Sequence, residues 1–254
     1  MLKKMMIALP LLAMLHGTAH AQFDKLLNDA KNALNQASGN NSGSGTSGLG
    51  SGLSNTDIVS GLKEALRVGT QNASGKLNQT NGYFGNPLVK ILLPKEVQQA
   101  ESMLRSFGFG SYADKLILSL NRAAEDAAKQ ATPIFVNAIT SMSITDGLQI
   151  LQGGNTAATD FLKGRTTSAL TTAFRPVIDK SLSKVGANTY WSQFFTAYNK
   201  LPITKTKVNT DLSGYVTEQA LTGMFTTIAQ EESNIRKNPA GTANALLQKV
   251  FGSK

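Results

Sequence analysis

A Ser-x-x-Asp pattern occurs three times in this chain, each time just before apolar residues with helical spacing. The three copies are Ser54–Asp57, Ser111–Asp114 and Ser143–Asp146. In a capping box of this kind, the serine hydroxyl and the acidic side chain satisfy backbone amides that the first turn of a helix leaves unpaired. We therefore expect a helix to begin at each copy. We also interpret the three aspartates as caps rather than as acid–base groups.

The stretch Lys163–Pro202 combines two more predicted helices with the only tryptophan of the chain. Pro176 is expected to kink or restart the first helix. Five aromatic side chains of the second recur at helical intervals: Tyr190, Trp191, Phe194, Phe195 and Tyr198. Such a stripe is typical of a hydrophobic core, because buried aromatic side chains contribute much of the packing energy. The alternative is a platform on which a ligand stacks.

Similar apolar stripes run through most of residues 56–254, with Gly or Pro at the breaks. Two stretches differ, because Leu88–Leu93 and Thr204–Leu212 have the composition of extended segments. They predict a small two-stranded β element beside the helices. The predicted fold class is therefore mainly α, a single multi-helix bundle-like domain.

The first 21 residues have the three parts of a secretory signal peptide. Lys3 and Lys4 form a short basic region, an apolar run of eleven residues follows, and Ala19-His20-Ala21 matches the pattern before a cleavage site. Eleven residues are fewer than the roughly 20 that a transmembrane helix needs, so we favour cleavage after Ala21 over an uncleaved anchor. We therefore expect export to the periplasm and no transmembrane segment in the mature chain.

Two further segments precede the helical domain. Residues 22–37 predict a short amphipathic helix, with apolar side chains recurring along one face. Residues 38–55 are rich in Gly, Ser and Asn and predict a flexible linker. A helix of about 16 residues is marginal by itself. Its docking partner could be its own domain, a partner helix or a membrane surface.

The composition excludes several kinds of catalytic site. The chain has no cysteine, and both histidines, His16 and His20, lie in the predicted signal peptide. A mature chain without His or Cys cannot form a Ser-His-Asp or Cys-His site, nor a zinc site of imidazole and thiolate ligands. The acidic spacing of a calcium-binding EF-hand loop is also missing. We therefore predict no metal site and no cofactor.

Positive charge is concentrated in one part of the chain. The formal net charge is +9, and loss of Lys3 and Lys4 with the signal peptide would leave +7. Residues 160–207 contain eight basic side chains against Asp160 and Asp179. Such a surplus favours an anionic envelope component, such as phospholipid headgroups or lipopolysaccharide phosphates. Nucleic acid is a poor partner for an exported chain, and an ordinary solvated helix face is the simpler alternative.

Five of these side chains are the candidate binding residues. If the aromatic side chains face the core, these residues predict an outer basic face. They are Lys163, Arg165, Arg175, Lys180 and Lys184.

Several long blocks resemble domain-of-unknown-function family 4197. They are EALRVGTQNASGKLNQTNGYFGNP (Glu64–Pro87), SLNRAAEDAA (Ser119–Ala128), TTAFRPV (Thr171–Val177), YVTEQALTGMFTTIAQEESNIRKNPA (Tyr215–Ala240) and LLQKVFG (Leu246–Gly252). The resemblance covers essentially all of residues 56–253. It implies an exported, mainly helical protein of Gram-negative-type bacteria. It implies no activity, ligand or catalytic residue.

Glycan cleavage is the enzymatic chemistry that this composition tolerates best, because a carboxylic acid with a raised pKa can serve as the general acid. Three fragments resemble the signature of lytic transglycosylases: Glu101-Ser102, Gly147–Ile150 and Ala197–Asn199. The first gap is wider than in that family, a Met is missing, and Lys200 stands where Ala-Gly is expected. In this alternative, Glu101 protonates the glycosidic oxygen.

The preferred hypothesis is non-enzymatic. Export, a basic segment and a tethered amphipathic helix together indicate a periplasmic binding or envelope-associated protein. Its partner would be an anionic envelope component or another protein.

Overall fold

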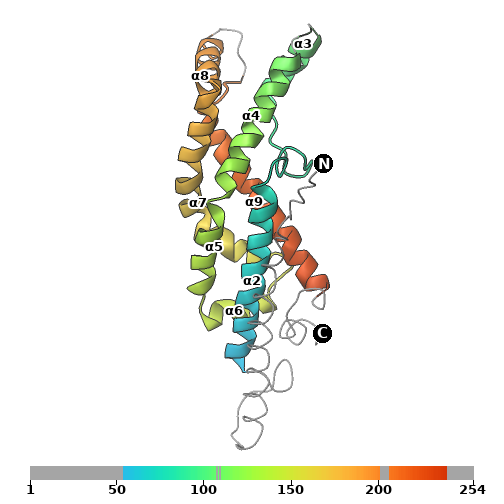
Figure 1. Cartoon of the computed structure of the whole chain (residues 1–254), viewed down its shortest axis with the longest axis vertical. Coiled ribbons are helices and arrows are strands. Elements are labelled where there is room, and N and C mark those ends of the chain that lie inside the picture. Colours follow the sequence, from blue (N-terminus) through green and yellow to red (C-terminus); the bar gives the residue numbers. More distant parts are fainter. Residues whose placement is uncertain (1–53, 107, 109, 201–205, 239–254) are drawn as a thin grey trace, which may run out of the picture. The chain divides into compact units, whose positions relative to one another are not determined.

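The computed structural model describes residues 54–106, 108, 110–200 and 206–238, and these contain helices and no strand. The segments expected to form the signal peptide, the amphipathic helix and most of the linker lie outside these ranges. The mainly α fold class is confirmed. The helices of Figure 1 are α2 (Asn55–Leu77), α3 (Lys95–Ser106), α4 (Gly110–Ala128), α5 (Ala131–Thr140), α6 (Ile144–Gln152), α7 (Ala157–Lys184), α8 (Ala187–Tyr198) and α9 (Leu212–Lys237).

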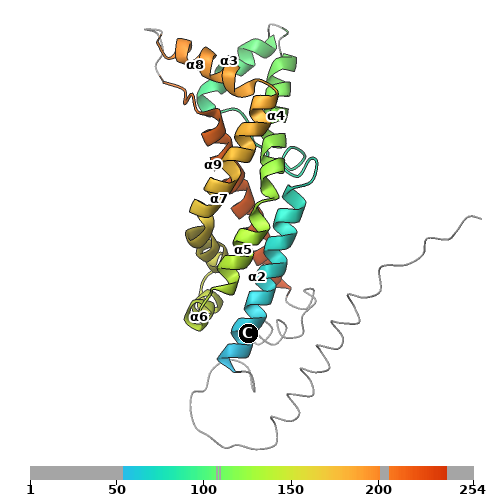
Figure 2. The same ribbon diagram turned by 60° about the vertical axis from the view of Figure 1, so that its left-hand side comes forward.

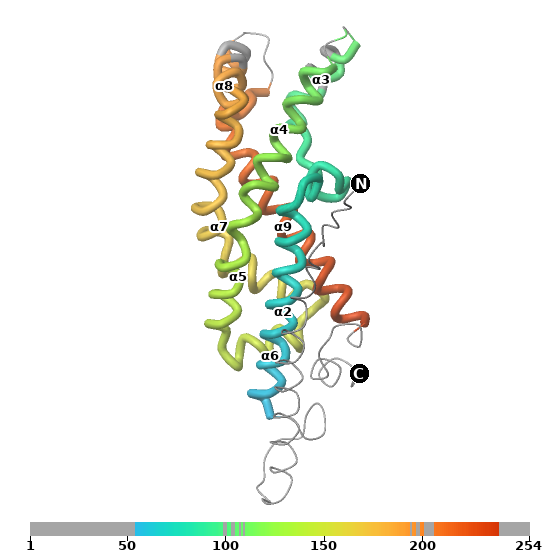
Figure 3. The backbone as a smooth tube through the Cα atoms, viewed as in Figure 1, coloured from blue at the N-terminus to red at the C-terminus, as the bar shows by residue number. Residues whose placement is uncertain are grey.

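Helix α7 lies at the centre of the packing. It contacts α4, α5, α6, α8 and α9, and α9 in turn contacts α2 and α4. Figure 2 shows α4 and α5 between α7 and α2, and Figure 3 shows α4 and α5 following one another along α7. On α7, apolar side chains recur every four residues and are fully buried: Leu170, Phe174, Ile178 and Leu182. This stripe is continuous because α7 runs as one helix through Pro176.

Two of the three predicted capping boxes are confirmed. Ser54 caps α2 and Ser143 caps α6, each accepting the backbone N–H of the aspartate three residues later. The prediction for Ser111 is wrong. That residue lies inside α4, which already begins at Gly110, and its expected partner Asp114 instead pairs with Arg105 of α3 at 2.7 Å.

The predicted β element does not form in the described residues. In Leu88–Leu93, the backbone N–H of Ile91 donates to the side-chain oxygen of Asn121, and the Asn121 amide donates back to the Ile91 carbonyl, both at 2.8 Å. The side chain of Asn199 likewise accepts the backbone N–H of Val208 and donates to its carbonyl. An asparagine side chain thus supplies the donor and acceptor that a neighbouring strand would have offered. Thr204 and its neighbour at 205 lie outside the described residues.

The aromatic stripe of α8 is buried in part. Trp191 and Phe195 are buried in the core and their rings lie 4.4 Å apart. The indole N–H of Trp191 donates to the carbonyl of Asn209. Tyr190, by contrast, is 73% exposed, so the expected core position is wrong for that side chain. The side chains of Phe194 and Tyr198 lie outside the description.

Membrane-spanning potential is low for each helix taken singly. Across the described ranges, no individual helix combines the length and the apolarity of a membrane span, and only the sharply bent pair α5–α6 reaches both criteria jointly.

Candidate functional site

The five candidate basic side chains are all exposed on α7 or at its end, but they do not share one face. At about 100° per residue, Lys163 and Arg165 point about 160° apart around the helix. Arg165 turns toward Asp146 of α6, at 3.8 Å, whereas Lys163 and Arg175 line a groove between α7 and α9. Lys180 and Lys184 line neither feature. Whether the five bind an anionic partner stays a prediction.

The groove between α7 and α9 has a volume of about 540 Å³. The two helices are antiparallel, since Arg175 meets Asp211 near one end and Thr159 meets Glu232 near the other. Leu221 lies within the groove and is buried. Seven of the fifteen lining residues are threonines: Thr156, Thr159, Thr167, Thr171, Thr217, Thr222 and Thr226.

Each of these seven hydroxyl groups already donates a hydrogen bond within the chain. On α7, Thr167 donates to the Lys163 carbonyl at 2.6 Å and Thr171 donates to the Thr167 carbonyl at 2.8 Å. The other five donate to a backbone carbonyl or a carboxylate at 2.7 to 3.0 Å. A hydroxyl whose donor is satisfied costs less to bury than a free one. The groove can therefore be covered at a small desolvation cost.

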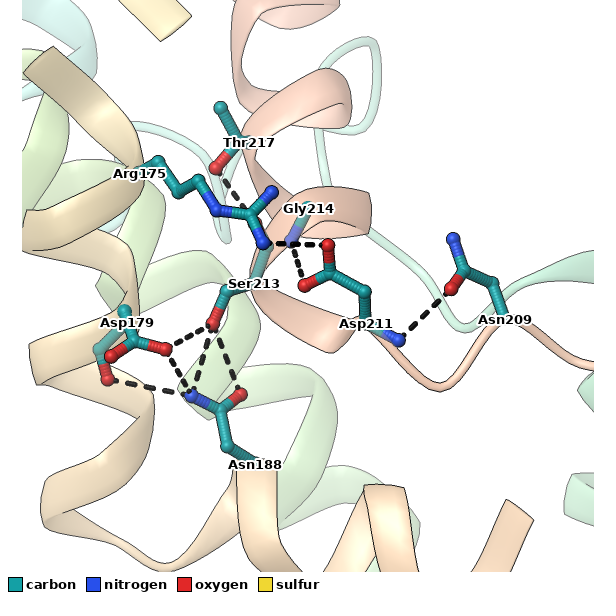
Figure 4. A network of polar contacts seen from close by, with 8 residues as sticks. All are labelled: Arg175, Asp179, Asn188, Asn209, Asp211, Ser213, Gly214 and Thr217. Carbon is teal, nitrogen blue, oxygen red and sulfur yellow. Dashed lines mark hydrogen bonds and ion pairs between the residues drawn. The ribbon is translucent and has the colours of Figure 1, made fainter. Parts of the chain in front are cut away.

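One end of the groove is held by the polar network of Figure 4. Asp211 caps α9 by accepting the Gly214 N–H, and it binds Arg175 Nη2 at 2.7 Å. Partial burial raises the pKa of Asp211, but the Gly214 and Arg175 contacts outweigh it and hold that pKa below its ordinary value. Arg175 is thereby fixed at the mouth of the groove.

The same network joins α7, α8 and α9. The Ser213 hydroxyl donates to Asp179 at 2.8 Å, and the Asn188 amide donates to the same carboxylate at 2.9 Å (Figure 4). These side chains satisfy one another, which suits a structural joint between three helices rather than a reactive centre.

The other end of the groove is anchored by a buried carboxylate. Glu232 of α9 accepts the backbone N–H groups of Ala158 and Thr159 at 3.0 and 2.9 Å, and it pairs with Arg236 at 2.8 Å. The first turn of α7 is thus capped from another helix, and the negative charge lies where the helix dipole favours it.

Sequence reasoning did not identify this groove. The available signal was the recurrence of threonine at intervals of four, Thr167 and Thr171 on α7 and Thr222 and Thr226 on α9. Each run is short. The two become one surface only once the antiparallel packing of α7 and α9 is known.

The structure does not favour the transglycosylase alternative. Glu101 lies on α3 and is bound by two nitrogens of Arg105 at 2.8 and 3.0 Å. Gly147–Ile150 lies on α6, at the opposite end of the helical unit from α3 in both Figure 1 and Figure 2. Residues meant to surround one glycosidic bond are therefore far apart. Within the described ranges, no three acidic or metal-ligating side chains form a cluster suited to a metal ion.

No curated protein and no solved structure matches the chain. Four of the five blocks that suggested a family lie in or extend from α2, α4, α7 and α9, the helices that build the core and the groove, and the fifth, Leu246–Gly252, lies outside the described residues. The family model described as protein of unknown function (DUF4197) matches residues 52–252, and the chain therefore belongs to that family.

Proposed function

We propose that this chain is an exported, non-enzymatic protein of the periplasm that acts by docking a protein partner along the α7–α9 groove. The export rests on the signal-peptide pattern of residues 1–21. The observation that carries the docking role is the set of seven groove threonines, whose hydroxyl donors are all satisfied internally.

The charges of the groove favour a protein over an anionic headgroup. Its lining contains two cations, Lys163 and Arg175, and two carboxylates, Asp160 and Glu218. A site for phosphate groups concentrates positive charge, whereas protein interfaces juxtapose charges of both signs in a complementary arrangement. The balanced lining therefore supports a protein partner, and an anionic envelope component becomes the competing outcome of the test.

Site-specific photo-crosslinking tests the docking role. A photoreactive residue replaces Thr222, in the groove, or Thr172, an exposed threonine of α7 outside it. Irradiation of cells that export the protein should yield protein adducts from position 222 and not from position 172. Equal labelling at both positions, or lipid adducts alone at position 222, would contradict the proposal.

Export and catalysis need separate measurements. Cell fractionation with N-terminal sequencing should find the protein in the periplasm with Gln22 as its first residue. A zymogram on purified peptidoglycan should show no clearing by the wild-type protein. Clearing that disappears in Glu101→Gln would establish the enzymatic alternative instead.

A further inference from the structure

We infer that the partner in the α7–α9 groove is a second copy of this chain, related by a two-fold axis that crosses the groove near Thr167. The inference rests on the proposed docking function of the groove and names its partner. It depends on where the four charged side chains lie along the two helices.

The register between α7 and α9 is fixed at two places. Thr159 N–H donates to Glu232 at 2.9 Å, and a Cβ placed on Gly214 would lie 3.1 Å from Arg175 Nη1. Because α7 and α9 are antiparallel, we count residues forward along one helix and backward along the other from these contacts. This places Glu218 of α9 beside about Thr171 of α7 along the helix axis. One end of the groove therefore holds Asp160 and Lys163, and the other holds Glu218 and Arg175.

An antiparallel second copy matches these charges. Lys163 and the level of Glu218 are about 8 residues apart along α7, and their midpoint is Thr167. Asp160 and Arg175 are about 15 residues apart, and their midpoint falls at the same place. One two-fold axis across the helices at Thr167 sets α7 against α7 of the second copy, so that Asp160 lies opposite the partner copy's Arg175, twice over. The same axis brings Lys163 level with the partner copy's Glu218, which lies on the adjacent helix α9.

The other possible two-fold axis, parallel to the helices, fits less well. A two-fold axis parallel to the helices places each end of the groove opposite the same end of the groove in the second copy. Lys163 is then offset by three residues from Asp160, and Arg175 by about four from Glu218, which amounts to about 5 to 6 Å. Only the crossing axis brings both pairs level.

The charges needed for these contacts are available. Within the described ranges, Lys163 and Glu218 have no ion-pair partner, and Arg175 binds Asp211 through Nη2 only. The second copy would supply the ion-pair partners that Lys163 and Glu218 lack within one chain. Because interfacial charge pairs fix register as well as adding affinity, the pairing selects the antiparallel arrangement.

The size of the face suits a modest dimer. From Thr156 to Arg175 it runs about 28 Å, and two adjacent helices are about 20 Å wide. The flat area of this face is therefore about 570 Å². Side chains make the real surface rougher and larger, which brings it closer to the roughly 800 Å² that each partner buries in a standard interface. Small threonine side chains let the helices of two copies approach closely. We expect dissociation constants in the micromolar range.

Sedimentation equilibrium of the purified protein with charge-swapped variants tests the inference. The wild type should dimerise, and Lys163→Glu or Glu218→Lys should each weaken the dimer at least tenfold by placing like charges together at two symmetric points. The double variant K163E/E218K should recover most of the affinity. Lys207→Glu, an equal charge change at an exposed residue outside the groove, should leave it unchanged.

The outcomes separate this inference from the docking function. A wild type that stays monomeric at millimolar concentration, or a double variant no better than the single ones, overturns the homodimer. The docking function still stands in that case if Thr222 crosslinks to a different protein. If dimerisation fails and Thr222 gives no protein adduct, both are wrong. Circular dichroism of each variant shows that it is folded.

Discussion

Two buried glutamates illustrate how single side chains position the helices. Glu125 of α4 accepts the backbone N–H groups of Tyr83 and Phe84, both at 3.1 Å, and fixes the turn after α2. Glu232 does the same for the first turn of α7. Neither carboxylate lines the α7–α9 groove. A negative charge inside the core is thus accounted for by amide donors and an arginine, without a catalytic role.

Removing Glu232 should be among the most damaging single changes. Glu232→Ala removes the acceptor of the Ala158 and Thr159 amides and breaks the ion pair with Arg236. Loss of one partner of a buried ion pair costs about 3–5 kcal/mol. Urea denaturation should show a loss of this size. Glu64→Ala, which breaks the exposed pair with Arg67, should cost no more than about 1 kcal/mol, and equal losses would contradict this account.

The Arg175–Asp211 pair should make stability depend on acid pH. The pKa of Asp211 is lower in the folded chain than its ordinary value of 3.8, so the unfolded chain binds the proton more readily. The pair therefore stabilises the fold above about pH 4, and this contribution is lost as the pH falls through the folded pKa.

Asp211→Asn isolates this effect, because asparagine can still cap α9. The variant should be less stable than the wild type near neutral pH by at most about 1 kcal/mol, since the pair is exposed. The difference should vanish near pH 2. A difference that persists or grows in acid, measured by urea denaturation at both pH values, would refute the assignment.

At the scale of elements, asparagine side chains replace the strand pairing that the sequence suggested. Leu88 and Val89 lie in a turn rather than in the expected extended segment, and the backbone of Ile91 bonds to Asn121, which is fully buried on α4. Val208 is bracketed by Asn199 of α8. These two asparagines attach irregular segments to helices and leave no strand edge open at either point.

Asn121→Ala should loosen that attachment. The change leaves the N–H and C=O of Ile91 buried without partners, which costs about 2–4 kcal/mol. Hydrogen exchange should show the Ile91 amide losing its protection while α9 amides keep theirs. Asn199→Ala, at a less buried position, should cost less. Unchanged protection at Ile91 would contradict the bracketing role.

Local sequence patterns predicted the helices and their caps better than they predicted the contacts between helices. The helical class, the caps at Ser54 and Ser143 and the burial of Trp191 follow from residues within one or two turns. The prediction for Ser111 was wrong because α4 already begins at Gly110, and its expected partner Asp114 pairs with Arg105 of another helix. Asn121 and Glu232 act over 30 and more than 70 residues, distances at which sequence spacing carries no signal.

At the scale of the whole molecule, α7 and α9 serve both the core and the surface. Their inner faces bury apolar stripes, and their outer faces form the threonine groove. The polar networks at the two ends set the register between them. That register spaces Asp160, Lys163, Glu218 and Arg175 so that a second copy can match them. The groove is thus a consequence of how the core is assembled.

The most direct measurement uses the absence of cysteine from the chain. Two copies of Thr167 should face one another across the proposed axis, so Thr167→Cys should form a disulfide-linked dimer under mild oxidation, seen on a non-reducing gel. Thr172→Cys is the matched control, because Thr172 is also exposed on α7 with its hydroxyl bonded to its own helix. We predict a linked dimer at position 167 and monomer at position 172. Monomer at both positions, or equal linkage at both, would contradict docking of a second copy in the groove.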